Sequence, residues 1–590
     1  MSMDLKAVVA LHVILLFHFS QEKNVLILLA DDAGLEGGVY NNSQCKTPNL
    51  DALAAKSLVF KNAFTSVSSC SPSRSVVLTG LPQHQNGMYG LHQGYHHFMT
   101  FNEVQSLPKI LHNNGIRTGK KHVGPEHVYP FDYAETEEHH SILKVGRNIT
   151  YMRNLVRKFL SANDSRPFFL YIGFHDPHRC GHTNPQYGAF CEKYGNREPG
   201  MGNIPDWEPV HYDPDKVKVP YFVQDTPASR LEIAKQYTTI SRLDQGVGLM
   251  LRELERSGHL DDTLVLYSSD NGIPFINGRT NLYDSGMVEP FLLASPYNTR
   301  RKGQVSEVMV SHVDITPTVL DWFNIPYPTY TVNNKPVKPT GKSLLPVLDS
   351  EPTSGWDTVF ASHNLHEVTM YYPMRVVRNR QYKLIQNLNY KMPFGIDQDF
   401  YISDSFQDIL NRTRSRKPTH WFKTLKEYYY RPLWELYDVE NDPLERKNLA
   451  LHSSLTSRSV YERMKQELVL WQNLTSDPWI CAPGGVLEDA GRYKNTPTCF
   501  QLDNSSNIWE LYDVENDPLE RKNLALHSSL TSRSVYERMK QELVLWQNLT
   551  SDPWICAPGG VLEDAGRYKN THTCFQLDNS VEIDHLHGEL

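Results

Sequence analysis

One cysteine stands in surroundings that suit chemistry on an anion. Cys70 precedes Pro72 by two residues and Arg74 by four, in the stretch S-C-S-P-S-R-S-V-V-L-T-G from Ser69 to Gly80. Proline suits the first turn of a helix, so Cys70 is expected at a helix N-terminus, where oxyanions bind. Arg74 would add a fixed positive charge one turn on. The pattern predicts an anion site, although a free cysteine is also commonly a small buried core residue.

Polar residues follow three apolar stretches at the point where each stretch ends. The stretches and the polar residues behind them are 24–30 with Asp31 and Asp32, 167–174 with His175 and His178, and 263–269 with Asp270 and Asn271. Buried parallel strands carry such side chains to one edge of a sheet, so we expect them to meet near Cys70. Their oxygens suit Ca²⁺ or Mg²⁺ better than zinc, although each cluster alone is also typical of a turn or cap.

Helical patterns separate these stretches, as an α/β sheet covered by helices requires. From about Ala228 to Ser257 apolar residues recur every three or four positions, and the pattern stops at Gly258. That stripe indicates core packing and no cofactor. Shorter helices are expected over 50–58 and over 312–323, the second interrupted at Pro317.

The composition is that of a large globular protein. The chain has 590 residues, of which 40% are hydrophobic, and its formal net charge is −8. This charge argues against a broad nucleic-acid surface, so an anionic substrate would require a concentrated basic pocket. Length alone favours two or more domains.

The first twenty residues have the pattern of a secretory signal peptide. Lys6 precedes an apolar run that ends near Phe19 and is too short to span a bilayer. A buried N-terminal strand is the alternative. No later stretch has the character of a membrane span.

The texture of the sequence changes near Pro373, where short β-rich runs begin. We therefore expect a main domain over 21–372 and a smaller α+β domain over 373–504, with the signal peptide over 1–20 before them and a tail over 505–590 behind them.

One segment occurs twice near the C-terminus. Residues 434–504 recur as 509–579, and the 71-residue copies differ only at Pro497, which is His572 in the second copy. Solenoid repeats diverge and need about three units, so two near-identical copies do not indicate a solenoid. We expect the first copy to complete the α+β domain and the second to be a weakly packed appendage, or a duplication of the recorded sequence alone. The reverse arrangement stays open.

Cysteines and glycosylation sequons fit an oxidising, secretory compartment. Three cysteine pairs close short loops: Cys180 with Cys191, Cys481 with Cys499, and Cys556 with Cys574. Cys45 and Cys70 remain, and either they pair with each other or Cys70 stays free for chemistry. The asparagines that stand in sequons are Asn41, Asn148, Asn163, Asn411, Asn473, Asn504 and Asn548. We predict glycosylation at the first four of them.

Several motifs resemble those of the sulfatase family. The string C-x-P-S-R-x-x-x-L-T-G resembles the signature whose cysteine is oxidised to formylglycine, and 119–124, G-K-K-H-V-G, resembles the motif G-K-x-H-x-G. The resemblance covers nearly the whole chain to Asn504 and is strongest to the branch that cleaves N-sulfate groups. The stretches that carry it are 63–74, 80–93, 174–182 and 269–283.

This resemblance implies a fold, a reaction and a set of site residues. The fold would be α/β, a large mixed or parallel sheet sandwiched by helices as in alkaline phosphatases and sulfatases, with a smaller C-terminal α+β domain. The reaction would be hydrolysis of the N-sulfate of glucosamine in heparan sulfate. Formylglycine would form at Cys70. The implied ligands of one Ca²⁺ per chain are Asp31, Asp32, Cys70, Asp270 and Asn271.

The resemblance also implies roles for the basic residues. Arg74 and Lys120 would hold the formylglycine hydrate, and His178 would protonate the departing amine. His122 would take a proton from the second hydroxyl, and Arg279 would clamp the sulfate. The chain departs from the family pattern in two places: Gly119 runs straight into Lys120 without intervening apolar residues, and Ala33 replaces the usual glycine after the aspartate pair.

Further implications concern partners and location. The family pattern implies a formylglycine-generating enzyme during maturation, a homodimer, and delivery to the lysosome through the secretory pathway. The terminal H-G-E-L is a weak match to an ER-retrieval signal. Two alternatives remain: an enzyme of the same fold that cleaves O-sulfates or phosphate esters, and a secreted glycan-binding pseudoenzyme. Phosphatase relatives use serine or threonine as nucleophile, so Cys70 argues against that variant.

Overall fold

The computed structural model describes residues 23–94, 96–119, 123–180, 185–451, 455–481 and the dipeptide 538–539. It forms two compact units, residues 1–477 and 478–590, and nearly all described residues belong to the first. The expected signal peptide and second repeat, apart from 538–539, lie outside the described residues. The same holds for Lys120, His122, the side chain of Cys481, and for Cys499, Cys556, Cys574, Asn504 and Asn548.

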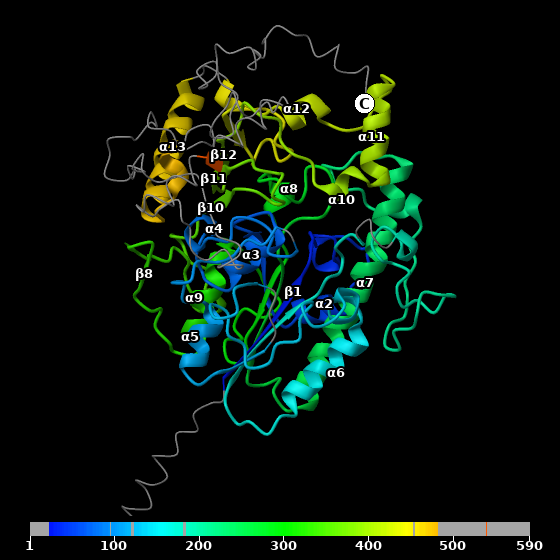
Figure 1. Ribbon diagram of the computed structural model, residues 1–590, viewed down its shortest axis with the longest axis vertical. Coiled ribbons are helices and arrows are strands. Elements are labelled where there is room, and N and C mark those ends of the chain that lie inside the picture. Colours follow the sequence, from blue (N-terminus) through cyan, green and yellow to red (C-terminus); the bar gives the residue numbers. More distant parts are fainter. Residues whose placement is uncertain are drawn as a thin grey trace, which may run out of the picture. The chain divides into compact units, whose positions relative to one another are not determined.

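A seven-stranded sheet forms the centre of the first unit (Figure 1). All neighbouring strands are parallel except where β6 pairs with β5 and β2. The predicted mixed, mainly parallel sheet is therefore confirmed. In spatial order the strands are β3 (Arg117–Gly119), β4 (Phe168–Gly173), β1 (Asn24–Ala30), β5 (Thr263–Ser269), β6 (Phe291–Ala294), β2 (Leu58–Phe64) and β7 (Val305–Ser311).

The central strand β1 buries both of its faces, which explains its uninterrupted apolar sequence. Val25, Ile27 and Leu29 join one core and the alternate residues join the other. Helices α5 (Leu107–Asn113) and α9 (Ile315–Trp322) cover the first face. Helices α2 (Pro48–Ala54), α6 (Ile149–Leu160) and α7 (Pro227–Arg256) cover the second face, on the opposite side of β1 in Figure 1.

The long helix was predicted to within a residue at each end, and two shorter ones were not. Helix α2 ends at Ala54, because Leu58 begins β2 instead of extending the helix. The expected break at Pro317 lies earlier, between a 3₁₀ turn over His312–Asp314 and α9. Pro317 falls in the first turn of α9, where a helix does not need the missing N–H.

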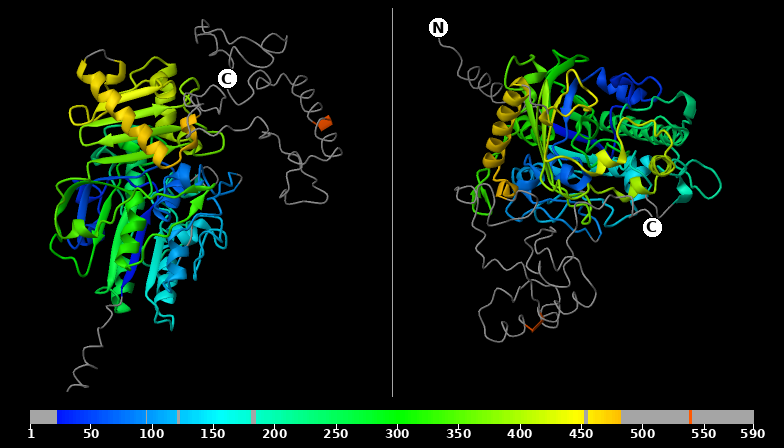
Figure 2. Two further views of the ribbon diagram at one scale, coloured as in Figure 1. Left: turned by 90° about the vertical axis from the view of Figure 1, so that its left-hand side faces the viewer. Right: turned by 90° about the horizontal axis from the view of Figure 1, so that it is seen from above.

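A second, four-stranded antiparallel sheet follows (Figure 2). Its strands are β10 (Thr358–His363), β11 (Met374–Asn379), β12 (Tyr382–Asn387) and β13 (Trp434–Asp438). Helix α13 (Leu455–Leu474) lies across one face, with Met464 and Leu468 packed among the apolar side chains of the sheet. Further helices and strands are α3 (Cys70–Val77), α4 (Gln83–Asn86), α8 (Asp284–Met287), β8 (Thr331–Val332), β9 (Lys335–Pro336), α10 (Gln398–Tyr401), α11 (Asp404–Arg414) and α12 (Leu425–Tyr429).

The first copy of the repeat supplies β13 and α13. At the end of α13, Asp477 forms a fully buried ion pair with Arg375 of β11 at 2.6 Å. His84 of α4 lies 2.8 Å from the hydroxyl of Thr475. The small sheet is thus complete with residues up to Asp477.

The described cysteines and sequons can now be located. Cys180 and Cys191 form a disulfide, while Cys45 and Cys70 are both free and buried, so they do not pair with each other. Asn41, Asn163 and Asn411 are exposed, whereas Asn148 is half-buried and caps α6 by accepting from Tyr151 N. Within the described part of the chain, no helix has both the length and the apolar character to cross a bilayer.

Candidate active site

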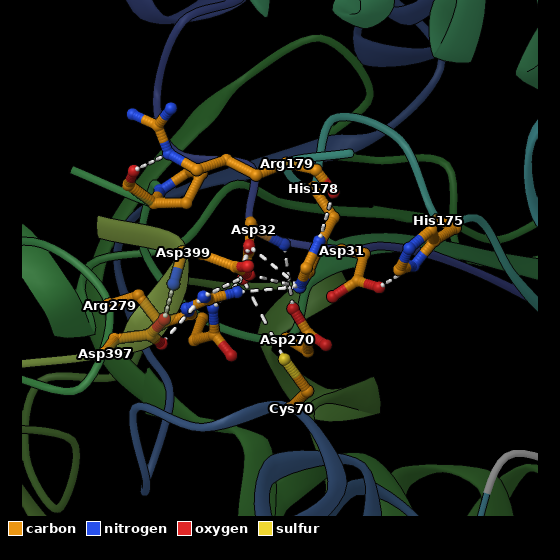
Figure 3. A network of polar contacts seen from close by, with 12 residues as sticks. Asp31, Asp32, Cys70, His175, His178, Arg179, Asp270, Arg279, Asp397 and Asp399 are labelled. Carbon is orange, nitrogen blue, oxygen red and sulfur yellow. Dashed lines mark hydrogen bonds and ion pairs between the residues drawn. The ribbon is translucent and has the colours of Figure 1, made fainter. Parts of the chain in front are cut away.

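The three predicted strand ends meet at one edge of the large sheet. Strands β4, β1 and β5 are adjacent and parallel, and β1 pairs with β5 in full register from Asn24 with Thr263 to Ala30 with Ser269. The polar residues behind each strand are therefore side by side. We call Asp31, Asp32, Cys70, His178 and Asp270 the strand-end wall (Figure 3).

Cys70 is the first residue of α3 (Cys70–Val77), directly behind the cap position Ser69. Only 6% of its surface is exposed. Burial, and then the carboxylates of Asp31 and Asp32, raise the pKa of the thiol well above its ordinary value. Cysteines that attack as thiolates need positive surroundings that lower this pKa. An unmodified Cys70 is thus poorly suited to act as a nucleophile.

Arg74 joins two of the strand ends. Its Nη2 lies 2.9 Å from Oδ2 of Asp31 and 2.9 Å from Oδ2 of Asp270, and its Nε also donates to Asp270. Asp31 Oδ2 lies 2.6 Å from Nδ1 of His175 as well. Burial opposes ionisation of Asp31, but Arg74 and nearby histidines outweigh it and hold the pKa of this carboxyl well below its usual range. Asp31 is therefore a charged acceptor at the floor of the site.

Asp32 connects Cys70 with the chain after β5. Its Oδ1 lies 3.9 Å from Cys70 Sγ and accepts from the side-chain amide of Asn271 at 2.7 Å. Its Oδ2 lies 2.5 Å from Nη1 of Arg279. Asp32 is fully buried, so both carboxylate oxygens are held in fixed directions.

His178 stands next to this aspartate with an assignable tautomer. Its Nδ1 is 2.7 Å from the carbonyl oxygen of Arg179, and its Nε2 is 2.8 Å from Nη1 of Arg279. A guanidinium can only donate and a carbonyl can only accept. Neutral His178 therefore carries its proton on Nδ1 and accepts at Nε2.

A buried charge network holds the loop that carries His178. Asp176 lies 2.5 Å from Nη1 of Arg147 and 2.7 Å from Nε of Arg242. Arg147 also donates to the carbonyl oxygen of His178 at 2.8 Å. All three charged side chains are at most 1% exposed. Sequence reasoning missed both arginines, because no local pattern connects either of them to Asp176.

A second group of residues arrives from the region of the small sheet. His366 and Glu367 follow β10, Asp397 caps α10, and Asp399 lies within α10. We call these four residues the C-terminal wall. None of them was predicted, since they lie in irregular segments without a recognisable motif.

Arg279 joins the two walls. Its Nη2 lies 2.7 Å from Oδ2 of Asp397 and 3.1 Å from Oδ2 of Asp399, while its Nη1 contacts Asp32 and His178 (Figure 3). Burial opposes ionisation of Asp397, but Arg279, together with His366, holds the pKa of this carboxyl far below its usual range. The predicted clamp on a sulfate is thus an arginine whose terminal nitrogens already have protein partners.

A cavity of about 790 Å³ opens above these groups. Among the residues that line it are Cys70, Arg74, His178, His366, Glu367 and Asp399. Both walls therefore face one space, with the thiol of Cys70 reaching it from the buried end of α3.

Comparison with known proteins gives the family. The family model named Sulfatase matches residues 23–325. Human N-sulphoglucosamine sulphohydrolase is 59% identical over 508 residues, which cover 85% of this chain and 100% of that protein. The chain belongs to the sulfatase family. An ulvan-active sulfatase of Formosa agariphila is 25% identical over 467 residues, covering 78% of this chain and 81% of that protein.

Solved structures show the same fold for this sulfatase. The structure of BT4656 in complex with its substrate D-glucosamine-2-N,6-O-disulfate aligns with a TM-score of 0.54. It is 17% identical and covers 77% of this chain and 98% of that chain. The likeness confirms the predicted sulfatase fold with its smaller C-terminal sheet.

Sulfatases use a formylglycine and a divalent metal ion, and the donor atoms present here fit such an ion. Ligand-capable atoms of Asp31, Asp32, Cys70 and His178 lie within 4.8 Å of one another. Oδ1 of Asp31 and Oδ1 of Asn271 are buried without a hydrogen-bond partner. Burial, and then Asp31, raise the pKa of Asp270 well above its ordinary value. A dication among these oxygens would favour the ionised carboxylates.

The two departures from the family pattern have different consequences in this sulfatase. The left-handed backbone after β1 falls on Asp32, with a φ of 62°, and not on Ala33. Alanine is therefore accommodated there. Strand β3 has only three residues and ends at Gly119, and the adjoining Lys120 and His122 lie outside the described residues.

The backbone directly after Asn271 is closely packed. A Cβ on Gly272 would lie 2.5 Å from the carbonyl oxygen of Ser285, so this position requires glycine.

Proposed function

We propose that this sulfatase hydrolyses the N-sulfate of glucosamine residues in heparan sulfate and releases sulfate and the free amine. The observation that carries the proposal is the meeting of Cys70, the oxygen ligands and His178 in one cavity. The 59% identity to the human N-sulphoglucosamine sulphohydrolase along its whole length supports the choice of substrate.

The chemistry at the sulfur would come from two groups of the family mechanism. Once converted to formylglycine, residue 70 would supply a hydrate hydroxyl as the nucleophile, and a divalent ion, which we propose to be Ca²⁺, would offset charge on the sulfuryl oxygens. Asp31, Asp32, Asp270, Asn271 and residue 70 would hold that ion.

The protein's own side chains would then position groups and move protons. Arg74 contacts the carboxylates of both Asp31 and Asp270 and starts from the same helix as residue 70, and it holds the pKa of Asp31 low. His178 would protonate the departing amine from Nε2, an atom that lies 3.6 Å from Asp32 and 3.8 Å from Asp399.

Arg279 must exchange a partner for this step. In its present position Nη1 donates to His178 Nε2, the atom that would carry the proton. The sulfate of the substrate would offer Nη1 an acceptor in place of Asp32 and His178. We propose that Arg279 moves from Asp32 to the sulfate while its Nη2 stays on Asp397.

Sulfate release from N-sulfated glucosamine tests the proposal, with an aryl O-sulfate as the comparison substrate. We expect the N-sulfated sugar to be hydrolysed with the higher kcat/KM, and mass analysis of the Cys70 peptide to show the aldehyde. Preference for the O-sulfate would make the protein an O-sulfatase. A persistent thiol with no hydrolysis of either substrate would instead support a glycan-binding pseudoenzyme.

Other properties are proposed on the family pattern. They are maturation by a formylglycine-generating enzyme, a homodimer, and a glycosylated lysosomal protein made through the secretory pathway. We also propose the remaining disulfides and the domain limits given by the sequence, except that the small α+β domain begins at β10, before residue 373. The exposed asparagines Asn41, Asn163 and Asn411 are accessible for glycans, whereas glycosylation of Asn148 would have to leave its cap on α6 intact.

A further inference from the structure

We infer that Asp399 recognises the nitrogen of the substrate and binds the ammonium group of the product, so that it selects N-sulfates over O-sulfates. This inference rests on the proposed function, because it assigns a specificity residue to that reaction. Asp399 lines the cavity and its side chain is 16% exposed, so a ligand can reach it.

The position of Asp399 relative to His178 carries the argument. Its Oδ2 lies 3.8 Å from Nε2 of His178, the atom that would donate a proton to the departing nitrogen. A group that receives this proton must lie about 3 Å from Nε2. A nitrogen at that distance from Nε2, on the cavity side, is also within reach of Asp399. Arg279 holds the carboxylate in place by a bond of 3.1 Å to the same oxygen.

The chemistry of the leaving group explains why a carboxylate belongs there. Water adds overall across the S–N bond: the sulfuryl group goes to one hydroxyl of the hydrate at position 70, sulfate then leaves with that oxygen as the aldehyde re-forms, and water restores the hydrate. The electron pair of the bond stays on nitrogen. One proton from His178 gives the amine, and a second from acidic solvent gives the ammonium ion. Positive charge therefore develops beside Asp399, and an anion there stabilises it.

An O-sulfate ester follows a different course at the same place. Its leaving group is an alcohol, which is neutral after a single protonation and offers no cation to Asp399. Hydrogen bonds to charged groups contribute about 1.5–3 kcal/mol, so the carboxylate should discriminate between the two products by about tenfold or more.

Glu367 provides a matched control on the same wall. It also lines the cavity and is 9% exposed, but within the described part of the chain its carboxylate forms no ion pair with Arg279 or His178. Glu367→Gln removes a carboxyl group from the cavity without changing the neighbours of His178. It separates a specific contact of Asp399 from the general negative potential of the wall.

Calorimetric binding of glucosamine and of N-acetylglucosamine to the metal-loaded protein tests the inference. At about pH 5.5, well below the ordinary pKa of an amine, the wild type should bind glucosamine about tenfold more tightly or better. Asp399→Asn should abolish this preference, Asp399→Glu should restore part of it, and Glu367→Gln should retain it. An Asp399→Asn variant that keeps the preference, or a Glu367→Gln variant that loses it equally, overturns the inference.

A measurement on the wild type keeps the test independent of variant folding. The preference for glucosamine should disappear at about pH 9, where the amine is neutral. Persistence of the preference at that pH contradicts an ionic contact. Failure of the proposed function gives a different result: glucosamine then still binds through Asp399, but N-sulfated glucosamine releases no sulfate.

Discussion

The two walls of the cavity are built in different ways. The strand-end wall consists of residues behind three neighbouring strands together with Cys70 at the start of α3, and all of its side chains except that of His178 are almost fully buried. The C-terminal wall comes from a loop and a short helix beyond the large sheet, and two of its carboxylates face the cavity. In this enzyme the groups that would break the bond stand behind strands of the large sheet or at the start of α3. The groups that would recognise the sugar stand on irregular segments, as loops commonly provide.

Replacement of Cys70 should have the largest effect on activity, and this effect should be confined to the chemistry of the strand-end wall. Cys70→Ala removes the precursor of the nucleophile, so kcat/KM for N-sulfated glucosamine should fall by about 10⁴-fold or more. Binding of glucosamine should persist, because the C-terminal wall is unchanged. Steady-state kinetics and calorimetry on the same preparation check both statements. Residual turnover above about 1% of wild type would contradict the assignment.

Loss of His178 should be the next largest effect. His178→Ala removes the proton donor for a poor amine leaving group, and general acids contribute about 10²–10⁴-fold. The effect should appear in kcat more than in KM. His211→Ala, at an exposed histidine outside the cavity, is the control and should keep wild-type rates. Equal kinetics of the two variants would assign His178 to structure alone.

Breaking the network behind His178 should lower stability as well as activity. Asp176→Asn leaves the guanidinium groups of Arg147 and Arg242 buried with one charge fewer, which costs about 3–5 kcal/mol in such networks. Urea unfolding measures the loss. Asp164→Asn, which breaks only the exposed pair with Arg166, is the matched control and should change little. A small change in both variants would show that the strand-end wall does not depend on this network.

The unfolding free energy should depend on pH through His84, which contacts the region of the small sheet. Burial lowers the pKa of His84 to about 4, against about 6.5 in an unfolded chain. As pH falls below about 6.5 the unfolded state binds a proton that the native state does not, so the native state loses stability until pH reaches the folded pKa. Between pH 6.5 and 5 this loss is about 2 kcal/mol. His84→Gln should therefore show a smaller fall in unfolding free energy over that interval than wild type. Identical slopes would mean that His84 binds its proton in the native state as it does in the unfolded chain.

Removal of the second repeat should have the smallest effect. The first copy already provides β13, α13 and the Asp477 ion pair, so a chain ending at Asn504 should keep the wild-type kcat/KM and unfolding free energy. A chain ending at Arg431 loses both elements and should not fold. If truncation at Asn504 also abolished folding, the second copy would be the structural one.

The difference between the two walls also explains which site residues could be predicted from the sequence. The apolar runs that end in Asp31-Asp32 and Asp270-Asn271 each predict a strand and its polar end within about ten residues. That these polar ends lie side by side then follows from the geometry of a parallel sheet. Asp399 reaches the site only because the four-stranded sheet places α10 there, and Arg147 pairs with Asp176 through packing of distant segments. Such contacts leave no local pattern. The sequence also predicted Arg279 as a site residue, but the carboxylate partners that the structure gives it could not be anticipated.

Arg279 has a consequence for how such enzymes can be altered. A single guanidinium ties Asp32 to Asp397 and Asp399, so neither wall can be replaced without changing the charge balance of the other. A chimera that takes its small-sheet region from a relative with neutral residues at 397 and 399 would leave this arginine with one carboxylate and pull it toward the metal ligands. The residues for the reaction and those for recognition of the sugar must therefore change together. We expect the substrate range to change by substitutions around Arg279 rather than by exchange of whole domains.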